Sequence, residues 1–325
     1  MSKKVFITGI AGFIGYHLAM YLHKRGDLVI GCDHFSDYYS VELKRKRAFL
    51  LNNSGIRVLE HDVLDLKSLD ALFKEKNFTH LVHLAAQPGV RFSLTNPHCY
   101  IQSNINAFLE VLETCRRFQP LALVYASSSS VYGLNTKIPF SESNRVDAPA
   151  SLYAATKKSN ELMAHSYHHL FQIPTTGLRF FTVYGPWGRP DMAYFSFTKA
   201  ISEGQPISVF NHGQMRRDFT YIDDIVQGCA SAIDYQAGYE IFNLGNHQPE
   251  PLMKLISSIE HHLGKKAILE FKPMQPGDVV ETYADITKSE QLLNFYPKTS
   301  LQEGIGKFVD WYEKSYLSQI LLNDY

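Results

Sequence analysis

The chain has 325 residues, enough for one large domain or two ordinary ones, and its 45% hydrophobic residues argue against a disordered chain. The formal net charge is zero, so neither a nucleic acid nor an anionic membrane surface is expected as a partner. An anionic ligand would have to be met by local arginines instead.

The expected location is the cytoplasm. No apolar run reaches the roughly 18 residues of a membrane helix. The first four residues lead directly into a strand-like stretch, without room for a secretory segment. The four cysteines form no C-x-x-C pair, so we expect reduced thiols.

Short apolar strands alternate with amphipathic helices through the first half of the chain. Strands that are apolar on both faces are typical of a parallel sheet covered by helices on both sides. This pattern predicts a doubly wound α/β fold of the Rossmann type. In chain order the expected elements are strand 5–8, helix 13–24, strands 28–33 and 57–60, helix 66–74, strand 81–84, helix 100–117, strand 122–126, helix 153–171 and strand 176–181.

The composition of the sequence and the length of the expected elements change after Phe181. Prolines and glycines cluster over residues 185–190, and the later elements are shorter and more mixed. We therefore expect an NAD-binding Rossmann domain over 1–182 and a smaller α/β C-terminal substrate domain over 183–325, with the ligand cleft between them. The segment at about 219–240 is expected to return to the first domain.

Glycines at positions 9, 12 and 15 follow the first expected strand and open the first helix. Small residues let the backbone approach a pyrophosphate, and the helix N-terminus offers free N–H groups. Asp33 ends the next strand, where a carboxylate can accept hydrogen bonds from both ribose hydroxyls and would repel a 2′-phosphate. The pattern predicts NAD rather than NADP. A tight turn without a ligand is the plainer alternative.

Residues after the third and fourth strands extend the predicted cofactor site. Asp62 could meet the adenine amino group or could instead cap the following helix. Small residues after the fourth strand would let the cofactor pass close, and Asn104 could reach back to that loop. The predicted cofactor-binding residues are Gly9, Gly12, Phe13, Ile14, Gly15, Asp33, Asp62, Val63, Ala85, Ala86, Gln87, Asn104, Tyr153 and Lys157, and no metal site is expected.

Tyr153 and Lys157 stand four residues apart, on one face of an expected helix. Tyrosine is a poor base because its ordinary pKa is about 10, but a nearby ammonium group and a positive nicotinamide ring favour the phenolate. The phenolate can then remove a hydroxyl proton while hydride leaves the same carbon for NAD. Ser128 is expected to share the substrate oxygen with Tyr153. The alternative is an unremarkable pair on a surface helix.

Together these motifs resemble the extended short-chain dehydrogenases of the NAD-dependent epimerase/dehydratase family, and within it the UDP-glucuronate 4-epimerases. The resemblance runs from residue 3 to about residue 310. The stretches that carry it are 33–40, 43–44, 85–93, 127–130, 151–158, 179–192, 216–224 and 275–279.

The resemblance implies that NAD takes hydride from C4 of UDP-glucuronate and returns it to the other face, giving UDP-galacturonate through a 4-keto intermediate. It implies that Tyr153 is the base, that Lys157 lowers its pKa and holds the nicotinamide ribose, and that Ser128 orients the C4 oxygen. Ser129 and Ser130 stand where related dehydratases and UDP-xylose synthases carry acids. Dehydration and xylose formation are therefore disfavoured.

The 4-keto uronate is a β-keto acid that could lose CO2. We predict that its carboxylate is held by the three serines 128–130 and Thr182; the alternative is that Ser130 and Thr182 only satisfy backbone groups. Thr182 also favours a uronate, because UDP-galactose epimerases carry asparagine there.

Arginines in the matching loops are expected to bind the diphosphate, because arginine offers paired donors. A surface salt bridge is the alternative for each of them. UDP-galactose epimerases carry an arginine where Gln275 stands, which leaves the third phosphate contact open. The predicted substrate-binding residues are Arg91, Ser128, Ser129, Ser130, Thr182, Arg189, Arg217, Gln275 and Asp278.

Two other functions remain open at this point: a UDP-glucose or UDP-N-acetylhexosamine 4-epimerase, and a non-enzymatic NAD-binding regulator on the same fold. The intact Tyr-x-x-x-Lys pattern favours an enzyme. The helices expected near 100–117 and 153–171 carry apolar residues such as Leu109 and Met163. The resemblance implies that they pair with those of a second copy in a four-helix homodimer.

Overall fold

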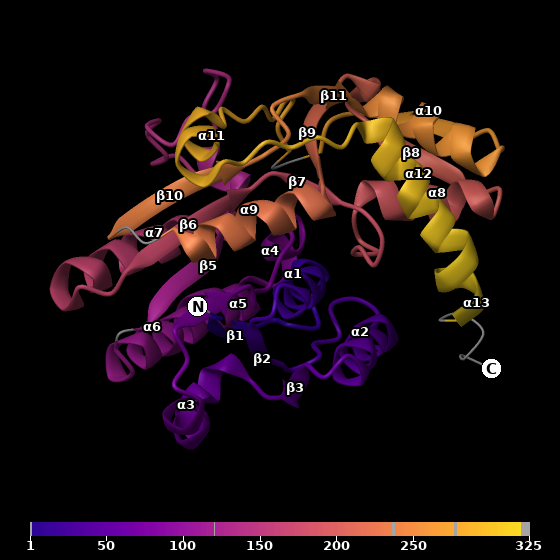
Figure 1. Cartoon of the computed structure of the whole chain (residues 1–325). Coiled ribbons are helices and arrows are strands. Elements are labelled where there is room, and N and C mark those ends of the chain that lie inside the picture. Colours follow the sequence, from indigo (N-terminus) through magenta and orange to yellow (C-terminus); the bar gives the residue numbers. More distant parts are fainter. Residues whose placement is uncertain (1, 120, 236–237, 276–277, 320–325) are drawn as a thin grey trace.

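A seven-stranded, all-parallel sheet forms the centre of the computed structural model, which describes residues 2–119, 121–235, 238–275 and 278–319. The strand order is β10-β6-β5-β4-β1-β2-β3, so the chain winds outward in both directions from β1 (Figure 1). This confirms the predicted doubly wound fold. Its strands are β1 (Lys4–Thr8), β2 (Leu28–Asp33), β3 (Arg57–Glu60), β4 (His80–His83), β5 (Ala122–Ser128), β6 (Thr175–Phe180) and β10 (Tyr239–Leu244).

Helices cover both faces of this sheet because successive strand residues are apolar on alternate sides. Val5 and Ile7 of β1 belong to one buried cluster with residues of α1 (Phe13–Lys24), α2 (Val41–Asn53) and α9 (Ile222–Asp234). Phe6 belongs to the opposite cluster. Its helices are α3 (Asp70–Lys76), α6 (Ala107–Arg117) and α7 (Leu152–Phe171).

Smaller sheets and helices form the rest of the molecule, as expected for a smaller α/β part. A three-stranded sheet has the order β11-β9-β7, and β12 pairs in parallel with β8. These elements are β7 (Thr182–Tyr184), α8 (Ala193–Ser202), β8 (Pro206–Phe210), β9 (Arg216–Tyr221), β11 (Pro249–Pro251), α10 (Leu252–Leu263), β12 (Ile268–Lys272), α11 (Thr287–Leu293), α12 (Leu301–Trp311) and α13 (Leu317–Gln319).

Two expected helices differ from the structure. The helix expected over 66–74 is a 3-10 helix η1 (Val63–Leu69) followed by α3, with a non-helical Asp65 near its start. The helix expected over 100–117 begins with a π-helical segment η2 (Ile101–Asn106) before α6. The remaining short elements are α4 (Phe92–Thr95), α5 (Pro97–Tyr100), η3 (Ser129–Tyr132), η4 (Asn211–Gly213) and η5 (Tyr312–Tyr316).

The chain returns to the large sheet after its first excursion into the smaller one. β9 belongs to the small sheet, whereas α9 packs on α1 and β10 pairs with β6 (Figure 1). We therefore propose that the returning part is 222–244, which replaces the expected limits of 219–240. The boundary near 182 stays a prediction.

Among the described residues, no helix combines the length and the apolar character that crossing a bilayer requires.

Candidate active site

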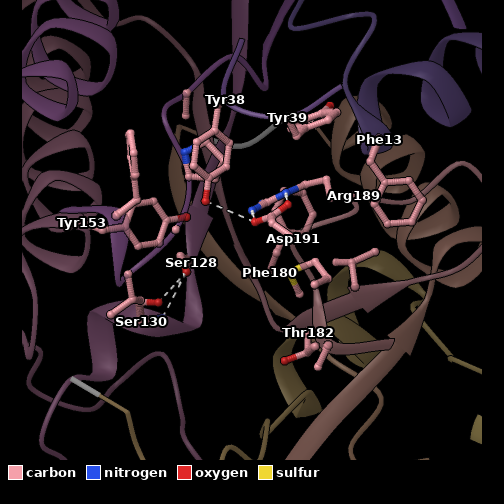
Figure 2. Close-up of a pocket in the computed structure, with 18 of the residues that line it drawn as sticks. Phe13, Tyr38, Tyr39, Ser128, Ser130, Tyr153, Phe180, Thr182, Arg189 and Asp191 are labelled. Atoms are coloured by element: carbon pink, nitrogen blue, oxygen red, sulfur yellow. Dashed lines mark hydrogen bonds and ion pairs between the residues drawn. The ribbon is translucent and has the colours of Figure 1, made fainter. Parts of the chain in front are cut away.

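One large cavity, of about 920 Å³, opens at the carboxyl ends of the parallel strands and extends to the smaller sheets (Figure 2). Ligands of doubly wound folds bind at this edge of the sheet. The structure brings most of the predicted site residues together here. Those that line the cavity are Gly9, Gly12, Phe13, Ile14, Gly15, Asp33, Val63, Ala85, Ala86, Arg91, Ser128, Ser129, Ser130, Tyr153, Lys157, Thr182, Arg189, Arg217 and Asp278.

The glycine loop, residues 9–15, packs too tightly for side chains. A Cβ on Gly9 would lie 2.7 Å from the backbone nitrogen of Ala85, and one on Gly15 would lie 2.2 Å from the Gly9 carbonyl oxygen. Gly9 also has a positive φ of 70°. Gly12 caps α1 without a side-chain hydrogen bond, and the first turn carries no acidic residue. The free N–H groups and the helix dipole therefore suit a diphosphate, which fits a dinucleotide.

The Asp33 carboxylate is fixed at the end of β2. It accepts hydrogen bonds from the backbone N–H groups of Ala11 (3.1 Å) and Phe35 (2.9 Å), and it borders the cavity. Each carboxylate oxygen has a second lone pair for a further hydrogen bond. A buried, preorganised acid at this place fits the ribose of NAD and disfavours an added phosphate.

Four predicted contacts lie outside the cavity wall. Asp62 accepts from the backbone N–H of Leu64 (2.9 Å) and caps η1, which is the alternative left open above. Asn104 does reach back to the loop: it accepts from the Gln87 N–H at 2.8 Å and donates to the Gln87 carbonyl at 3.1 Å. Asn104 therefore fixes this loop from behind the cavity wall, and Gln87 presents its backbone to Asn104. The side-chain oxygen of Gln275 is buried without a hydrogen-bond partner.

Tyr153 and Lys157 lie in the first two turns of α7, which Ser151 caps by accepting from the Ala154 N–H (3.1 Å). Burial raises the pKa of the Tyr153 phenol, while its hydrogen bond with Ser128 and the charge of Arg189 act in the other direction. The sequence argument assigned that effect to Lys157. In the structure the Lys157 ammonium donates to the Ala126 carbonyl (3.0 Å), and burial lowers its pKa to about 8.

The serine run turns from β5 into η3 beside Tyr153. The Ser128 hydroxyl accepts from the Ser130 N–H (3.1 Å) and donates to the Ser130 hydroxyl (3.1 Å). Thr182, which begins β7, faces the same space (Figure 2). The two serines thus satisfy each other in part, and their hydroxyls still border the cavity. The serine run and Thr182 thus offer hydroxyl groups for hydrogen bonds, and none of these residues carries a carboxylate.

The three predicted arginines enter the cavity from different elements. Arg189 is ion-paired with Asp191 (2.5 Å), and Arg91 is ion-paired with Asp278 (3.0 Å). Arg217 donates to the carbonyls of Arg216 and Val280, and burial lowers its pKa. Two of the three arginines are therefore ion-paired, and all three line the cavity wall.

Sequence reasoning missed several residues in the centre of the cavity. Tyr38 donates to Asp191 at 3.2 Å, so these two and Arg189 form a cluster between Tyr153 and Phe13 (Figure 2). Burial and the Asp191 charge raise the pKa of Tyr38 to about 12, so it remains a donor. The wall also includes Lys44. The only signal for these residues was their place inside the resembling stretches 33–40, 43–44 and 179–192.

The sequence matches the model of the NAD dependent epimerase/dehydratase family over residues 5–245, and the chain belongs to this family. It is 51% identical to UDP-glucuronate 4-epimerase 4 of Arabidopsis thaliana, over 96% of this chain and 76% of the plant protein. It is 49% identical to Protein CapI of Staphylococcus aureus, over 96% and 99% of the two chains. The crystal structure of a Bacillus cereus UDP-glucuronic acid 4-epimerase with UDP-glucuronic acid and NAD is similar, with a TM-score of 0.90, 36% identity and coverage of 96% and 99%.

Proposed function

We propose that this chain is an NAD-dependent isomerase that interconverts UDP-glucuronate and UDP-galacturonate at C4 through a 4-keto intermediate. The observation that carries the proposal is the lining of one cavity by the glycine loop, by Tyr153 and Lys157, and by a serine run without acids. The relatives that are named UDP-glucuronate 4-epimerases support the same conclusion.

The glycine loop and Asp33 would hold NAD, which supplies a hydride acceptor at C4 and later the hydride donor. Tyr153 takes the proton of the C4 hydroxyl and gives it back after the sugar has turned over. Ser128, through its hydrogen bond with Tyr153, holds the same oxygen. Lys157 of α7 extends to the Ala126 carbonyl of β5 and supplies a positive charge that favours the phenolate.

The same cavity wall would restrain the uronate carboxylate. Loss of CO2 from a β-keto acid requires the breaking C–C bond to align with the ketone π system. Hydroxyl donors on Ser128, Ser129, Ser130 and Thr182 would keep that bond out of alignment. Arg91, Arg189 and Arg217 would meet the diphosphate after exchanging their present partners, with Asp278 and Asp191 receiving the two ion-paired arginines between turnovers.

Thr182→Ala tests the restraint on the carboxylate. One donor fewer lets the C–C bond to the carboxylate move into line with the ketone π system, so with NAD supplied in excess UDP-4-keto-pentose should form beside the epimer, with one NAD reduced for each CO2 lost, and Thr182→Ser should suppress it again. Proton NMR of the reaction mixture with UDP-glucuronate measures both products. Unchanged epimerisation with no keto-pentose from Thr182→Ala would show that the threonine only satisfies backbone groups.

We propose a homodimer built from α6 and α7 of two copies. The two helices are joined by the Tyr167–Glu113 hydrogen bond (2.7 Å) and leave large apolar side chains in solvent. Leu109, Leu162 and Leu170 are 41%, 58% and 66% exposed. Burying such side chains against a second copy is favourable by roughly 25 cal/mol per Å².

Light scattering tests the dimer. Twice the chain mass of 37.0 kDa is expected for the wild type. Leu162→Glu should give the monomer mass, because a carboxylate would be buried without a partner. Leu134→Glu is the matched control, since Leu134 is 69% exposed and lies outside both helices, and it should remain dimeric. A wild type of monomer mass at micromolar concentration would contradict the proposal.

One experiment decides between the candidate functions. The purified protein is incubated with UDP-glucuronate, without added NAD, and UDP-galacturonate is sought by NMR; UDP-glucose and UDP-N-acetylglucosamine are run in parallel. Faster turnover of UDP-glucose or UDP-N-acetylglucosamine than of UDP-glucuronate would identify a neutral-hexose epimerase. No turnover of any sugar by NAD-loaded protein would favour a regulator. We further propose a cytoplasmic location, in keeping with four free cysteines.

A further inference from the structure

The Trp187 loop, residues 185–190, is docked on the cofactor-binding helices by three consecutive backbone carbonyls. His17 of α1 hydrogen-bonds to the Pro186 carbonyl at 2.9 Å. Arg47 of α2 donates to the carbonyls of Trp187 (2.5 Å) and Gly188 (3.1 Å). The next residue is Arg189, at the cavity wall. The position of that arginine therefore depends on two side chains that the catalytic steps do not use.

The Arg47 guanidinium also hydrogen-bonds to the glycine loop. Its second terminal nitrogen donates to the Ala11 carbonyl (3.0 Å) and to the Tyr39 hydroxyl (2.9 Å). Ala11 is fully buried between Gly9 and Gly12, which border the cavity. The planar Arg47 guanidinium thus hydrogen-bonds to the glycine loop through one terminal nitrogen and to the Trp187 loop through the other.

Arg47 is a buried cation without a carboxylate partner. Its side chain is 0% exposed, and every acceptor named above is a neutral carbonyl or hydroxyl. Among the residues that the structure describes, it forms no ion pair. Burying an unpaired charge is costly unless an opposite charge lies near. The cavity on the other side of the glycine loop has room for a negatively charged group.

Two titratable neighbours, His17 and Lys44, lie close enough to Arg47 for its charge to contribute to their pKa shifts. His17 has its pKa lowered to about 4, mainly by burial and further by the charge of Arg47, so it is neutral at pH 7. Lys44 has its pKa lowered to about 8, mainly by burial; the Asp33 charge opposes this, and the charge of Arg47 adds to it by a smaller amount. Because His17 is neutral, it ties the Pro186 carbonyl without adding a second buried charge.

We propose that Arg47 is a positioning residue that couples cofactor occupancy to the substrate loop. Its charge favours a dinucleotide diphosphate on the far side of the glycine loop. Its fork holds the Trp187 loop so that Arg189 stands ready for the diphosphate of the substrate. The inference rests on the proposed NAD site and not on the identity of the sugar.

Two substitutions of Arg47 and one control separate the effect of its positive charge from the effect of its branched hydrogen bonding. Arg47→Met removes both, whereas Arg47→Lys keeps a positive charge but cannot span all four acceptors. Arg45→Met is the matched control, because Arg45 lies on the same helix and is a half-exposed side chain paired with Glu60. Two quantities are measured on the protein as purified: the NAD dissociation rate after dilution, from NAD retained per chain, and the affinity for UDP by calorimetry.

Arg47→Met is expected to release NAD roughly ten-fold faster than the wild type, equivalent to about 1.4 kcal/mol, and to bind UDP more weakly by a similar factor. Arg47→Lys should retain NAD like the wild type and still bind UDP weakly. Arg45→Met should change neither quantity. A residue with only a structural role would lower the melting temperature without this split between NAD and UDP.

Unchanged NAD release in Arg47→Met would overturn the role of the charge, and wild-type UDP affinity in Arg47→Lys would overturn the role of the fork. If Arg47→Met does not fold, His17→Leu supplies the second measurement. It cuts one loop tie without changing charge, so weaker UDP binding with normal NAD retention is expected, and unchanged UDP binding contradicts the coupling. A wild type that holds no NAD at all would instead refute the proposed function.

Discussion

Tyr153→Phe is expected to lower kcat for epimerisation by roughly 10²- to 10⁴-fold, the contribution typical of a positioned proton-transfer group. The ring would keep its packing against Tyr100, whose centroid lies 6.1 Å away, and only the hydroxyl beside Ser128 would be lost. NAD retention and thermal stability should therefore stay near the wild-type values. Initial rates with UDP-glucuronate, followed by NMR, measure the loss.

Tyr167→Phe is the matched control for that variant. Tyr167 lies on the same helix, but its hydroxyl donates to Glu113 and does not border the cavity. It should leave kcat unchanged. A Tyr153→Phe enzyme with more than a tenth of the wild-type kcat would remove Tyr153 from the proposed role of base.

Lys157→Met is expected to reduce kcat by roughly 100-fold and to shift the pH–rate profile to higher pH. Lys157 is buried one helical turn after the tyrosine, and the proposed mechanism has its positive charge favour the phenolate, so its loss should raise the pKa of the Tyr153 phenol. It also leaves the Ala126 carbonyl without this donor. The pH dependence of kcat distinguishes this effect from simple destabilisation, which would lower the rate without moving the profile.

Lys158→Met is the control, since Lys158 is the adjacent lysine and pairs with Glu161 away from the tyrosine. Its profile should match that of the wild type. If Lys157→Met keeps the wild-type profile and only its melting temperature falls, the lysine is a packing residue and another group favours the phenolate.

The sheet could be predicted from the sequence because strands that are buried on both faces consist of continuous apolar runs. β2 and β3 have the expected bounds, β1 begins one residue earlier than expected, and β4 is shifted by one residue at both ends. The interior of α3 and η1 was less predictable. Asp62 caps a 3-10 helix that runs through residues 66–69 of the expected helix, so the α-helix begins only at Asp70.

The glycine loop and the Tyr153–Lys157 pair were predictable because their spacing along the chain is itself the signal. Whether a side chain faces the cavity is decided by remote packing. Asn104 reaches the Gln87 backbone, as the sequence suggested, whereas Tyr38 meets Asp191 across 153 residues of sequence. No local pattern encodes the contact between Tyr38 and Asp191, and only the resemblance drew attention to the two stretches that contain them.

β10 joins the large sheet only after the intervening segments 181–238, and this order along the chain affects folding during synthesis. Six of the seven strands have left the ribosome once Phe180 emerges, but β6 then exposes an unpaired edge until Leu244 follows. At about 5–20 residues per second, that edge stays open for several seconds during synthesis. Open strand edges invite pairing with other chains. The nascent protein should therefore be most vulnerable to aggregation, and most in need of a chaperone, during the interval in which its substrate-binding segments are being translated.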